Sequence, residues 1–319
     1  MRGAACPDRN KRVSVADFST RRAHTMSGLF GLLAAILSSS LGGTAIVATR
    51  YLAGTLDPIT IGVIRFGGGF LILLPIAFLS GSKWPERRDR PYVGALGFLF
   101  FALFPILFNA SLIFTTAARG ALALSTLPLI AMLVAALLGI ERLTLRKTIG
   151  VLVAMAGVAI ALATSLSHAP AGAWRGDLLM VAAAFCMALY NVWSRPFISR
   201  SGPIPFVAAG MGVGALALLL IAPIVGTPTD IFKLSATQWI ACVYLAAICG
   251  TLIFYLWAYA LGKTSPTLVS LSVTFNAVTA SIFGALVLNE PVTLNHVTGL
   301  IAVIIGIVIA STGRTSSLD

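Results

Sequence analysis

Charged residues are scarce in this sequence. Only 10% of its 319 residues are Asp, Glu, Lys or Arg, whereas 58% are hydrophobic and the mean hydropathy is +0.97. A soluble globular domain carries about 25% charged residues. The shortage argues against a soluble enzyme or binding module and indicates a polytopic membrane protein.

Residues that carry chemistry are scarcer still. No Asp, Glu or Lys lies deep in a long apolar run, and the three histidines and four cysteines show no metal-ligand spacing or CxxC pair. Walker and GxSxG motifs are also missing. We therefore expect no catalytic residue, no metal and no cofactor, and the protein is not predicted to be an enzyme. The net charge of +12 lies in short tracts between apolar runs, so membrane orientation explains it better than a nucleic-acid partner.

One motif is present twice. Glu141-Arg-Leu-Thr-Leu145 precedes Gly150 and Gly157, and Glu290-Pro-Val-Thr-Leu294 precedes Gly299 and Gly306, with an offset of 149 throughout. A repeat of this length indicates a duplicated unit of about 150 residues.

Apolar runs of spanning length follow one another along the chain, and about 20 residues cross about 30 Å of hydrocarbon. We predict ten spans, at residues 29–50, 58–80, 91–113, 117–139, 146–165, 177–198, 204–225, 238–261, 266–288 and 294–312. The predicted fold is all-α and integral to the membrane. It has a disordered cytoplasmic tail (1–26), a first five-helix repeat (27–165), a second (177–312) and a short tail (313–319).

The basic residues predict the orientation. The tail and alternate loops hold 17 Lys and Arg residues, whereas the opposite loops hold only Arg50, Arg175 and Lys233. This bias places both termini in the cytoplasm. Because five spans per repeat is an odd number, the two repeats enter the membrane from opposite sides. Inverted repeats of this kind are typical of secondary transporters.

The chain resembles the EamA-type ten-span permeases of the drug/metabolite transporter superfamily. The matching residues are Gly43–Leu52, Ile64-Arg65-Phe66, Leu127-Pro128-Leu129, the Gly-x-Glu-x-Leu-Thr pattern at 139–144, Tyr255–Leu261, Glu290-Pro291 and the repeated glycines. The resemblance implies an inner-membrane carrier, often an exporter of amino acids, with a central cavity lined by spans one, three, four, six, eight and nine. It also implies a proline in span nine like Pro128, the predicted hinge of span four. Ala277 stands there, so we expect a straighter span nine.

Arginines in apolar surroundings are candidate substrate-binding residues, because a charge inside a membrane is costly. Arg65 is the deepest, and it either pairs with carbonyls or Asp57 or binds an anionic group of the substrate. Arg119 either snorkels to the interface or lines the cavity, and Arg50 is expected to be an interfacial anchor.

Polar residues in spans three, six, eight and nine complete the candidate site. Ser272, Asn276 and Thr279 share one helix face and either join helices or contact substrate; Asn276 is the strongest candidate. The remaining cavity candidates are Asn109, Tyr190 and Tyr255.

The sequence predicts a multi-pass inner-membrane transporter, monomeric or homodimeric, whose partners are a small-molecule substrate and the lipid bilayer. It would move amino acids or related metabolites, by export, through alternating access. The small multidrug resistance carriers of the same superfamily use a mid-membrane Glu that is absent here, which disfavours proton-coupled export of cationic drugs. A drug exporter, an organophosphate or nucleotide-sugar exchanger and a non-transporting lipid-handling protein stay open as alternatives.

Overall fold

The computed structural model describes residues 15–140, 144–165, 172–225, 228–289 and 294–311, and within these ranges it contains helices and no strand. Eight helical segments are long and apolar enough to cross a membrane: Gly28–Leu52, Pro58–Leu79, Arg90–Phe114, Ala117–Leu137, Ala173–Ser201, Pro203–Ile224, Ala236–Lys263 and Pro266–Leu288. Two further helices, α8 and α15, cover the other two predicted spans.

The first half runs from α1 to α8. Its elements are α1 (Val15–Leu52), α2 (Pro58–Gly62), the π-helix η1 (Val63–Gly67), α3 (Gly68–Leu79), α4 (Arg90–Phe98), the π-helix η2 (Leu99–Leu103), α5 (Phe104–Phe114), α6 (Ala117–Leu124), α7 (Leu127–Leu137) and α8 (Leu145–Ser165).

The second half runs from α9 to α15. Its elements are α9 (Ala173–Ser201), α10 (Pro203–Val225), the 3₁₀ helix η3 (Pro228–Lys233), α11 (Ala236–Tyr244), the π-helix η4 (Leu245–Leu252), α12 (Ile253–Lys263), α13 (Pro266–Ser272), α14 (Thr274–Leu288) and α15 (Leu294–Ser311).

Short polar side chains start several of these helices. The Asp57 carboxylate accepts the backbone N–H groups of Ile59 and Thr60, at 2.9 and 3.0 Å. Thr116 caps α6 and Ser265 caps α13 in the same way, and these two caps are 149 residues apart. Equivalent positions of the two halves therefore use the same local chemistry.

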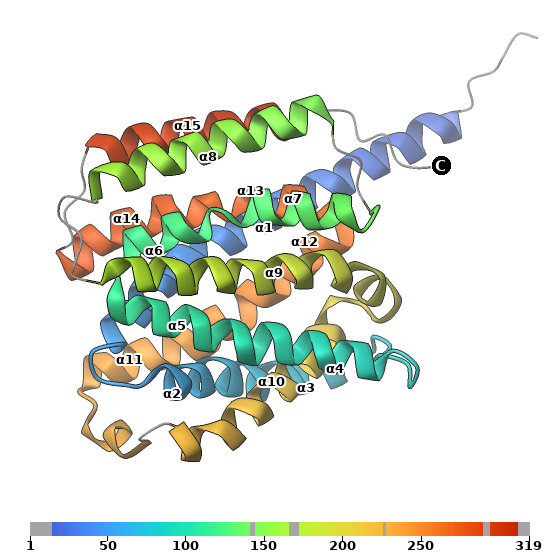
Figure 1. Cartoon of the computed structure of the whole chain (residues 1–319). Helices are drawn as coiled ribbons and strands as arrows, with labels where there is room; N and C mark the ends of the chain where they lie inside the picture. Colours follow the sequence, from blue (N-terminus) through green and yellow to red (C-terminus); the bar gives the residue numbers. More distant parts are fainter. Residues whose placement is uncertain (1–14, 141–143, 166–171, 226–227, 290–293, 312–319) are drawn as a thin grey trace, which may run out of the picture.

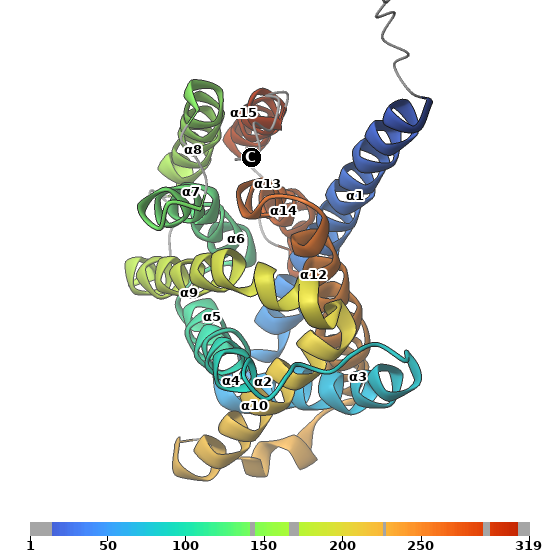
Figure 2. The same ribbon diagram turned by 90° about the vertical axis from the view of Figure 1, so that its right-hand side faces the viewer.

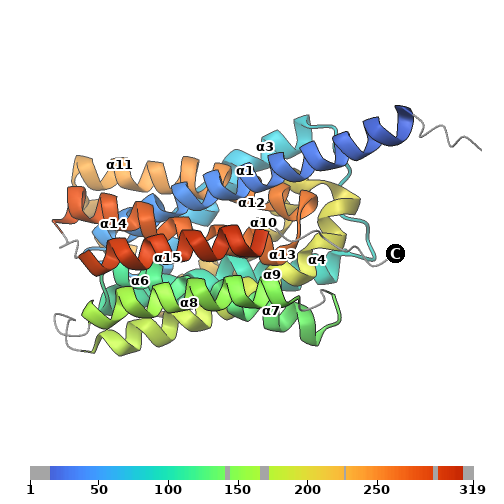
Figure 3. The same cartoon turned by 90° about the horizontal axis from the view of Figure 1, so that it is seen from above.

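The helices form one elongated bundle. α8 and α15 lie side by side along one edge, and α10 lies at the opposite edge (Figures 1 and 2). Between these edges, α1 packs against α12 and α14, while α9 packs against α5, α6 and α7. Seen from above, α1 extends beyond the other helices at one end of the bundle (Figure 3).

Glycines let helices of the two halves approach closely. A Cβ on Gly97 of α4 would lie 2.6 Å from the Cα of Gly210 of α10, and a Cβ on Gly69 of α3 would lie 2.8 Å from the carbonyl carbon of Gly250 of η4. Small residues at such crossings allow backbone-to-backbone packing in membranes.

The predicted disordered tail needs a correction. α1 begins at Val15, so residues 15–26 continue the first membrane helix instead of being disordered. The physical reason is that residues 8–27 contain no Pro or Gly that would break a helix propagating from the membrane. Residues 1–14, the tail 313–319, Glu141 and Glu290 lie outside the described residues.

Candidate functional site

A narrow cavity of about 40 Å³ lies between the two halves. Its lining comes from α1, η1, η2, α5, α6, α9, α12 and α14, so spans one, two, three, four, six, eight and nine contribute. These are the six spans implied by the resemblance, with span two added. At ~10–15 Å³ per water molecule, the cavity holds only about three waters.

Arg65 is the charged residue of this cavity. It lies in η1 and is 5% exposed, and its guanidinium carbon lies 5.2 Å from the ring centroid of Phe66 and 5.5 Å from that of Phe254. Within the described residues its Nε has no hydrogen-bond partner and no carboxylate pairs with it. The two rings offset part of the burial cost, since a cation–π contact contributes about 0.5–2 kcal/mol.

Asp57, one of the partners considered for Arg65, is occupied elsewhere. Its carboxylate caps α2 and also accepts the Thr60 hydroxyl at 2.5 Å. Asp57 therefore caps a helix and does not neutralise Arg65, so the guanidinium is available to a ligand in the cavity.

Asn276 is the second polar group without a full set of partners. It is 7% exposed, lines the same cavity, and its Oδ1 has no partner among the described residues. It lies against Gly42 of α1, where a Cβ would come within 2.9 Å of that oxygen. A buried acceptor of this kind costs about 1–3 kcal/mol when it is left unsatisfied.

Aromatic side chains form much of the wall. Phe100, Phe254 and Trp257 line the cavity, and the rings of Phe100 and Phe254 meet edge to face at 5.5 Å. The Trp257 indole N–H donates to Asn191 Oδ1 at 2.9 Å, and Asn191 Nδ2 donates to Ser270 Oγ at 3.0 Å. This chain of hydrogen bonds fixes the orientation of the indole.

The sequence reasoning missed Asn191 and Trp257 as site residues. The prediction for span eight named Tyr255, whereas Trp257, two residues further along, lines the cavity. The signal was available, because Asn191 is a polar residue in the middle of an apolar run and must find a buried partner.

Irregular helical turns surround the cavity. Arg65 lies in η1, Phe100 lies in η2, and Ile253 and Phe254 directly follow η4. Pro105 explains the wider turn of η2, because it cannot donate an N–H to the carbonyl of residue 101. π-helical turns are frequent at functional sites.

Spans four and nine are both interrupted beside the cavity. α6 ends at Leu124 and α7 begins at Leu127 with Pro128 in its first turn. α13 ends at Ser272 and α14 begins at Thr274, so Val273 separates them. The expectation of a straighter span nine is therefore corrected: the helix breaks without a proline at 277, because the Val273 N–H bonds back to Ser270 and Leu271 instead of continuing the α-helical ladder.

Arg119 and Arg50 have protein partners. Arg119 is 6% exposed, and its Nε donates to both carboxylate oxygens of Asp177, at 3.0 and 3.1 Å. Arg50 donates to the carbonyl of Leu112 at 2.6 Å. Neither lines the central cavity. Arg119 does not extend to the surface as the snorkelling alternative expected, because it is buried in the ion pair with Asp177.

Three predicted polar residues have hydrogen bonds within the bundle and do not line the cavity. Asn109 donates to the Pro58 carbonyl at 2.8 Å, and Ser272 shares a hydrogen bond with Ser39 at 2.9 Å. Thr279 bonds back to the carbonyl of residue 275 at 3.0 Å. For Ser272 this is the helix-joining alternative, whereas the Thr279 hydrogen bond stays within α14. Of that helix face, only Asn276 lines the cavity.

Tyr190 and Tyr255 lie outside the cavity lining as well. Tyr190 is buried and stacks on Phe100 at a centroid distance of 4.0 Å, so it supports the wall from behind. Tyr255 is half-buried and packs against Tyr259 at 6.3 Å.

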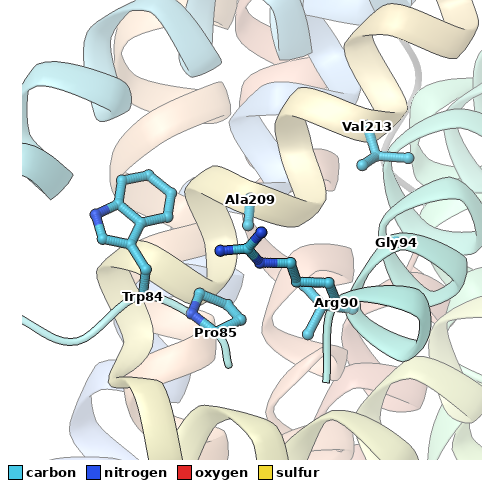
Figure 4. A pocket seen from close by; sticks show the side chains of 7 residues that line it. Trp84, Pro85, Arg90, Gly94, Ala209 and Val213 are labelled. Carbon is cyan, nitrogen blue, oxygen red and sulfur yellow. The ribbon is translucent and has the colours of Figure 1, made fainter. Parts of the chain in front are cut away.

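A larger hollow of about 320 Å³ lies elsewhere, between α4 and α10 (Figure 4). We call it the α4–α10 groove; its lining residues are Trp84, Pro85, Arg90, Val93, Gly94, Ala209 and Val213. Arg90 and Val213 are exposed, and among the described residues no buried side-chain N or O atom without a partner belongs to its lining. The central cavity is the better candidate for the substrate despite its smaller size, because Arg65 and Asn276 converge there.

Comparisons with known proteins show which family the chain resembles. The sequence profile of the EamA-like transporter family matches residues 29–163 and 174–312. An uncharacterized transporter of Archaeoglobus fulgidus is 26% identical, over 86% of this chain and 95% of its own length. A probable terminal-alkyne amino-acid exporter of Streptantibioticus cattleyicolor is 26% identical, over 58% of this chain and 61% of its own.

A solved crystal structure shares the fold. It superposes with a TM-score of 0.70 at 21% sequence identity and covers 90% of this chain and 98% of the other. With the two matches of the family profile and the apolar helices, this identifies a multi-pass membrane protein. The chain belongs to the EamA-like transporter family, within the drug/metabolite transporter superfamily.

Proposed function

We propose that the protein is a secondary transporter that exports small metabolites, namely amino acids or related compounds, by alternating access between two inverted five-helix repeats. The observation that carries this proposal is the central cavity, which both halves line and which holds the buried Arg65, a cation without an ion-pair partner in the described part of the chain. The name of the amino-acid exporter among its relatives agrees with this substrate class.

Contacts between the halves support the inverted arrangement. Gly306 is the repeat equivalent of Gly157, yet a Cβ on Gly306 would lie 2.6 Å from the backbone nitrogen of Ala154 and also meets the Gly150 carbonyl. If the last helices of the two repeats ran side by side in the same direction and in register, equivalent residues would meet, and Gly306 would contact Gly157 instead. The contact fits two helices, α8 and α15, that cross in opposite directions as the fifth and tenth members of a ten-span bundle.

The cation in the cavity favours a substrate that carries a carboxylate. A guanidinium stays charged in proteins and presents paired N–H donors that match a carboxylate. The Asn276 oxygen is free to accept from an ammonium group, and the aromatic wall suits an apolar side chain. An organophosphate would need several cations, and a cationic drug would be repelled by Arg65.

The cavity must widen before it takes a metabolite, since ligand pockets measure about 300–1,000 Å³. Ion pairs hold α9 to the first half near both of its ends: Asp177 binds Arg119 of α6, and Arg200 binds Asp89 beside α4 at 2.8 Å. These residues are about 35 Å apart along the helix at 1.5 Å per residue. Breaking one pair at a time is a plausible way to open one end of the bundle.

Counterflow in liposomes tests the proposal. Purified full-length protein would be reconstituted with an unlabelled amino acid inside, and entry of the labelled compound would be measured for L-alanine, L-leucine and L-phenylalanine. We expect counterflow of at least one of them, and an at least ~10-fold loss in Arg65→Gln, which removes charge-assisted hydrogen bonds. The matched control is Arg175→Gln, an exposed arginine over Trp174, which should transport like the wild type.

The result separates the alternatives. If the wild type moves no amino acid, organophosphate or drug of a wider panel, the non-transporting lipid-handling protein is the better account. If it moves an amino acid and Arg65→Gln does so equally well, transport stands and the role of Arg65 is refuted.

A further inference from the structure

The α4–α10 groove is the second site that the structure builds, and it does not depend on the transported substrate. α4 and α10 touch at Gly97 and Gly210, and the groove lies beside this crossing. Val93 and Gly94 form one wall, and Ala209 and Val213, one turn apart on α10, form the other. These are small apolar side chains, so the groove is shaped for a hydrocarbon segment.

Arg90 gives the groove a charge. It is the first residue of a membrane-spanning segment, and its side chain extends into the groove toward Trp84, Pro85 and Ala209 (Figure 4). No hydrogen bond or ion pair of its guanidinium is found in the part of the chain that the structure describes. The neighbouring Asp89 does not neutralise it, because that carboxylate binds Arg200 at 2.8 Å.

The rim of the groove is basic. Lys83, Arg87 and Arg88 are exposed in the same loop, whereas Glu86 is its only exposed acid. Trp84 packs on Phe78 at a centroid distance of 5.1 Å and adds an aromatic ring to the lining of the groove. Tryptophan and basic residues together are typical of the level of the lipid headgroups.

We infer that the α4–α10 groove binds an anionic phospholipid, with one acyl chain against Val93, Ala209 and Val213 and the headgroup phosphate on Arg90. Basic pockets between membrane helices hold anionic headgroups, and a guanidinium forks onto phosphate oxygens. A zwitterionic lipid carries a cation that the basic rim disfavours. A soluble anion leaves the apolar walls uncovered.

The position of the groove gives the bound lipid a structural effect. Its walls come from α4 of the first half and α10 of the second, so one lipid contacts both halves. A ligand that binds the folded state stabilises it by mass action. Anionic lipid should therefore raise the melting temperature of the protein.

Lipid retention by the purified full-length protein tests the inference. Delipidated protein in detergent would be titrated with dioleoyl phosphatidylglycerol or dioleoyl phosphatidylcholine and followed by native mass spectrometry and thermal unfolding. We expect one phosphatidylglycerol to bind at least ~10-fold more tightly than phosphatidylcholine, and this preference to be lost in Arg90→Gln. Arg90→Lys should keep part of it, because the charge remains but the fork does not.

Two further variants separate the groove from general electrostatics. Arg175→Gln removes the same charge from an exposed arginine that lies neither in the groove nor on its rim, and it should bind phosphatidylglycerol within about twofold of the wild type. Val213→Trp fills the groove at an exposed position without a change of charge and should lose the lipid. The inference is overturned if Arg175→Gln and Arg90→Gln weaken binding equally, if Val213→Trp keeps the lipid, or if the two lipids bind the wild type alike.

Discussion

At the scale of single residues, the proposed function depends on two polar residues that line one cavity, Arg65 and Asn276. Among the described residues, Arg65 Nε and Asn276 Oδ1 have no hydrogen-bond partner, and the other buried side-chain atoms without one belong to residues outside the cavity lining. An unpaired buried cation costs several kcal/mol. We interpret the unpaired groups as a binding site, because a bound ligand that supplies the missing partner would remove this cost.

Two variants of the same helix face separate contact with substrate from helix packing. Asn276→Ala removes the free acceptor and should reduce transport at least ~10-fold with little loss of stability. Ser272→Ala removes a hydroxyl that bonds Ser39 of α1, so it should lower the free energy of unfolding by about 1 kcal/mol and leave transport near normal. Counterflow and thermal unfolding of both variants provide the check, and equal wild-type activity in both would remove Asn276 from the site.

The two ion pairs of α9 should contribute unequally to the stability of the protein, so removing the acid of each pair should lower stability by different amounts. Asp177→Asn leaves the buried Arg119 without its ion-pair partner. It should destabilise the protein by about 3 kcal/mol, since breaking a buried pair leaves an uncompensated charge. Asp89→Asn leaves Arg200, whose side chain is 41% exposed, and should cost less. Melting temperatures of the two variants measure the difference; a larger loss in Asp89→Asn would contradict this assignment.

Site residues could be predicted from the sequence where the free-energy cost of placing the side chain in the membrane is evident from its sequence neighbours alone. Arg65 and Asn276 were found because a charge or amide in an apolar run needs a partner. The partners of Arg119 and Asn109 were not predictable, because Asp177 and Pro58 are 58 and 51 residues away and only the tertiary structure brings them close. Trp257 was missed because the opposite helix face was chosen.

At the scale of elements, glycine placement sets where helices meet. Gly97 and Gly94 are three residues apart in α4, but only a Cβ on Gly97 meets the backbone of Gly210; nothing lies within 4 Å of one on Gly94. Gly97→Ala should therefore destabilise the protein by about 1–3 kcal/mol through overpacking. Gly94→Ala should be neutral or stabilising by up to about 1 kcal/mol, because it improves helix propensity.

Thermal unfolding in detergent measures both glycine variants under the same conditions. Similar melting temperatures for the two would show that the crossing of α4 and α10 is looser than described.

Helix ends and breaks were only partly predictable. Pro58 and Asp57 mark the start of α2 as expected from their chemistry. The break at Val273 has no Pro or Gly at its position, and η1, Val63–Gly67, has no proline either. Such turns arise from packing around the cavity, which single-helix periodicity does not record.

At the scale of the whole molecule, composition and the 149-residue repeat predicted an all-helical membrane protein, and the structure and family confirm that class. The size of the cavity and the groove between α4 and α10 were beyond prediction, because both depend on how far helices from different halves separate. The inverted orientation stays a prediction from the basic loops.

Cysteine labelling tests that orientation. In a Cys6→Ser background, in which the described cysteines Cys186, Cys242 and Cys249 are buried, an impermeant maleimide would be applied to intact cells. Phe232→Cys should react from outside, and Ser82→Cys should react only after permeabilisation, since they lie in loops of opposite predicted sides. Labelling of both from the same side would contradict the topology.

The most direct measurement of the central claim is a comparison of ligands in the wild-type protein. In proteoliposomes, each amino acid that exchanges would be competed with its amino alcohol, which lacks the carboxylate. The account predicts that the amino alcohol competes at least ~10-fold less well, and that Arg65→Gln abolishes this discrimination. Equal competition by both compounds in the wild type would contradict the claim that Arg65 binds the substrate carboxylate.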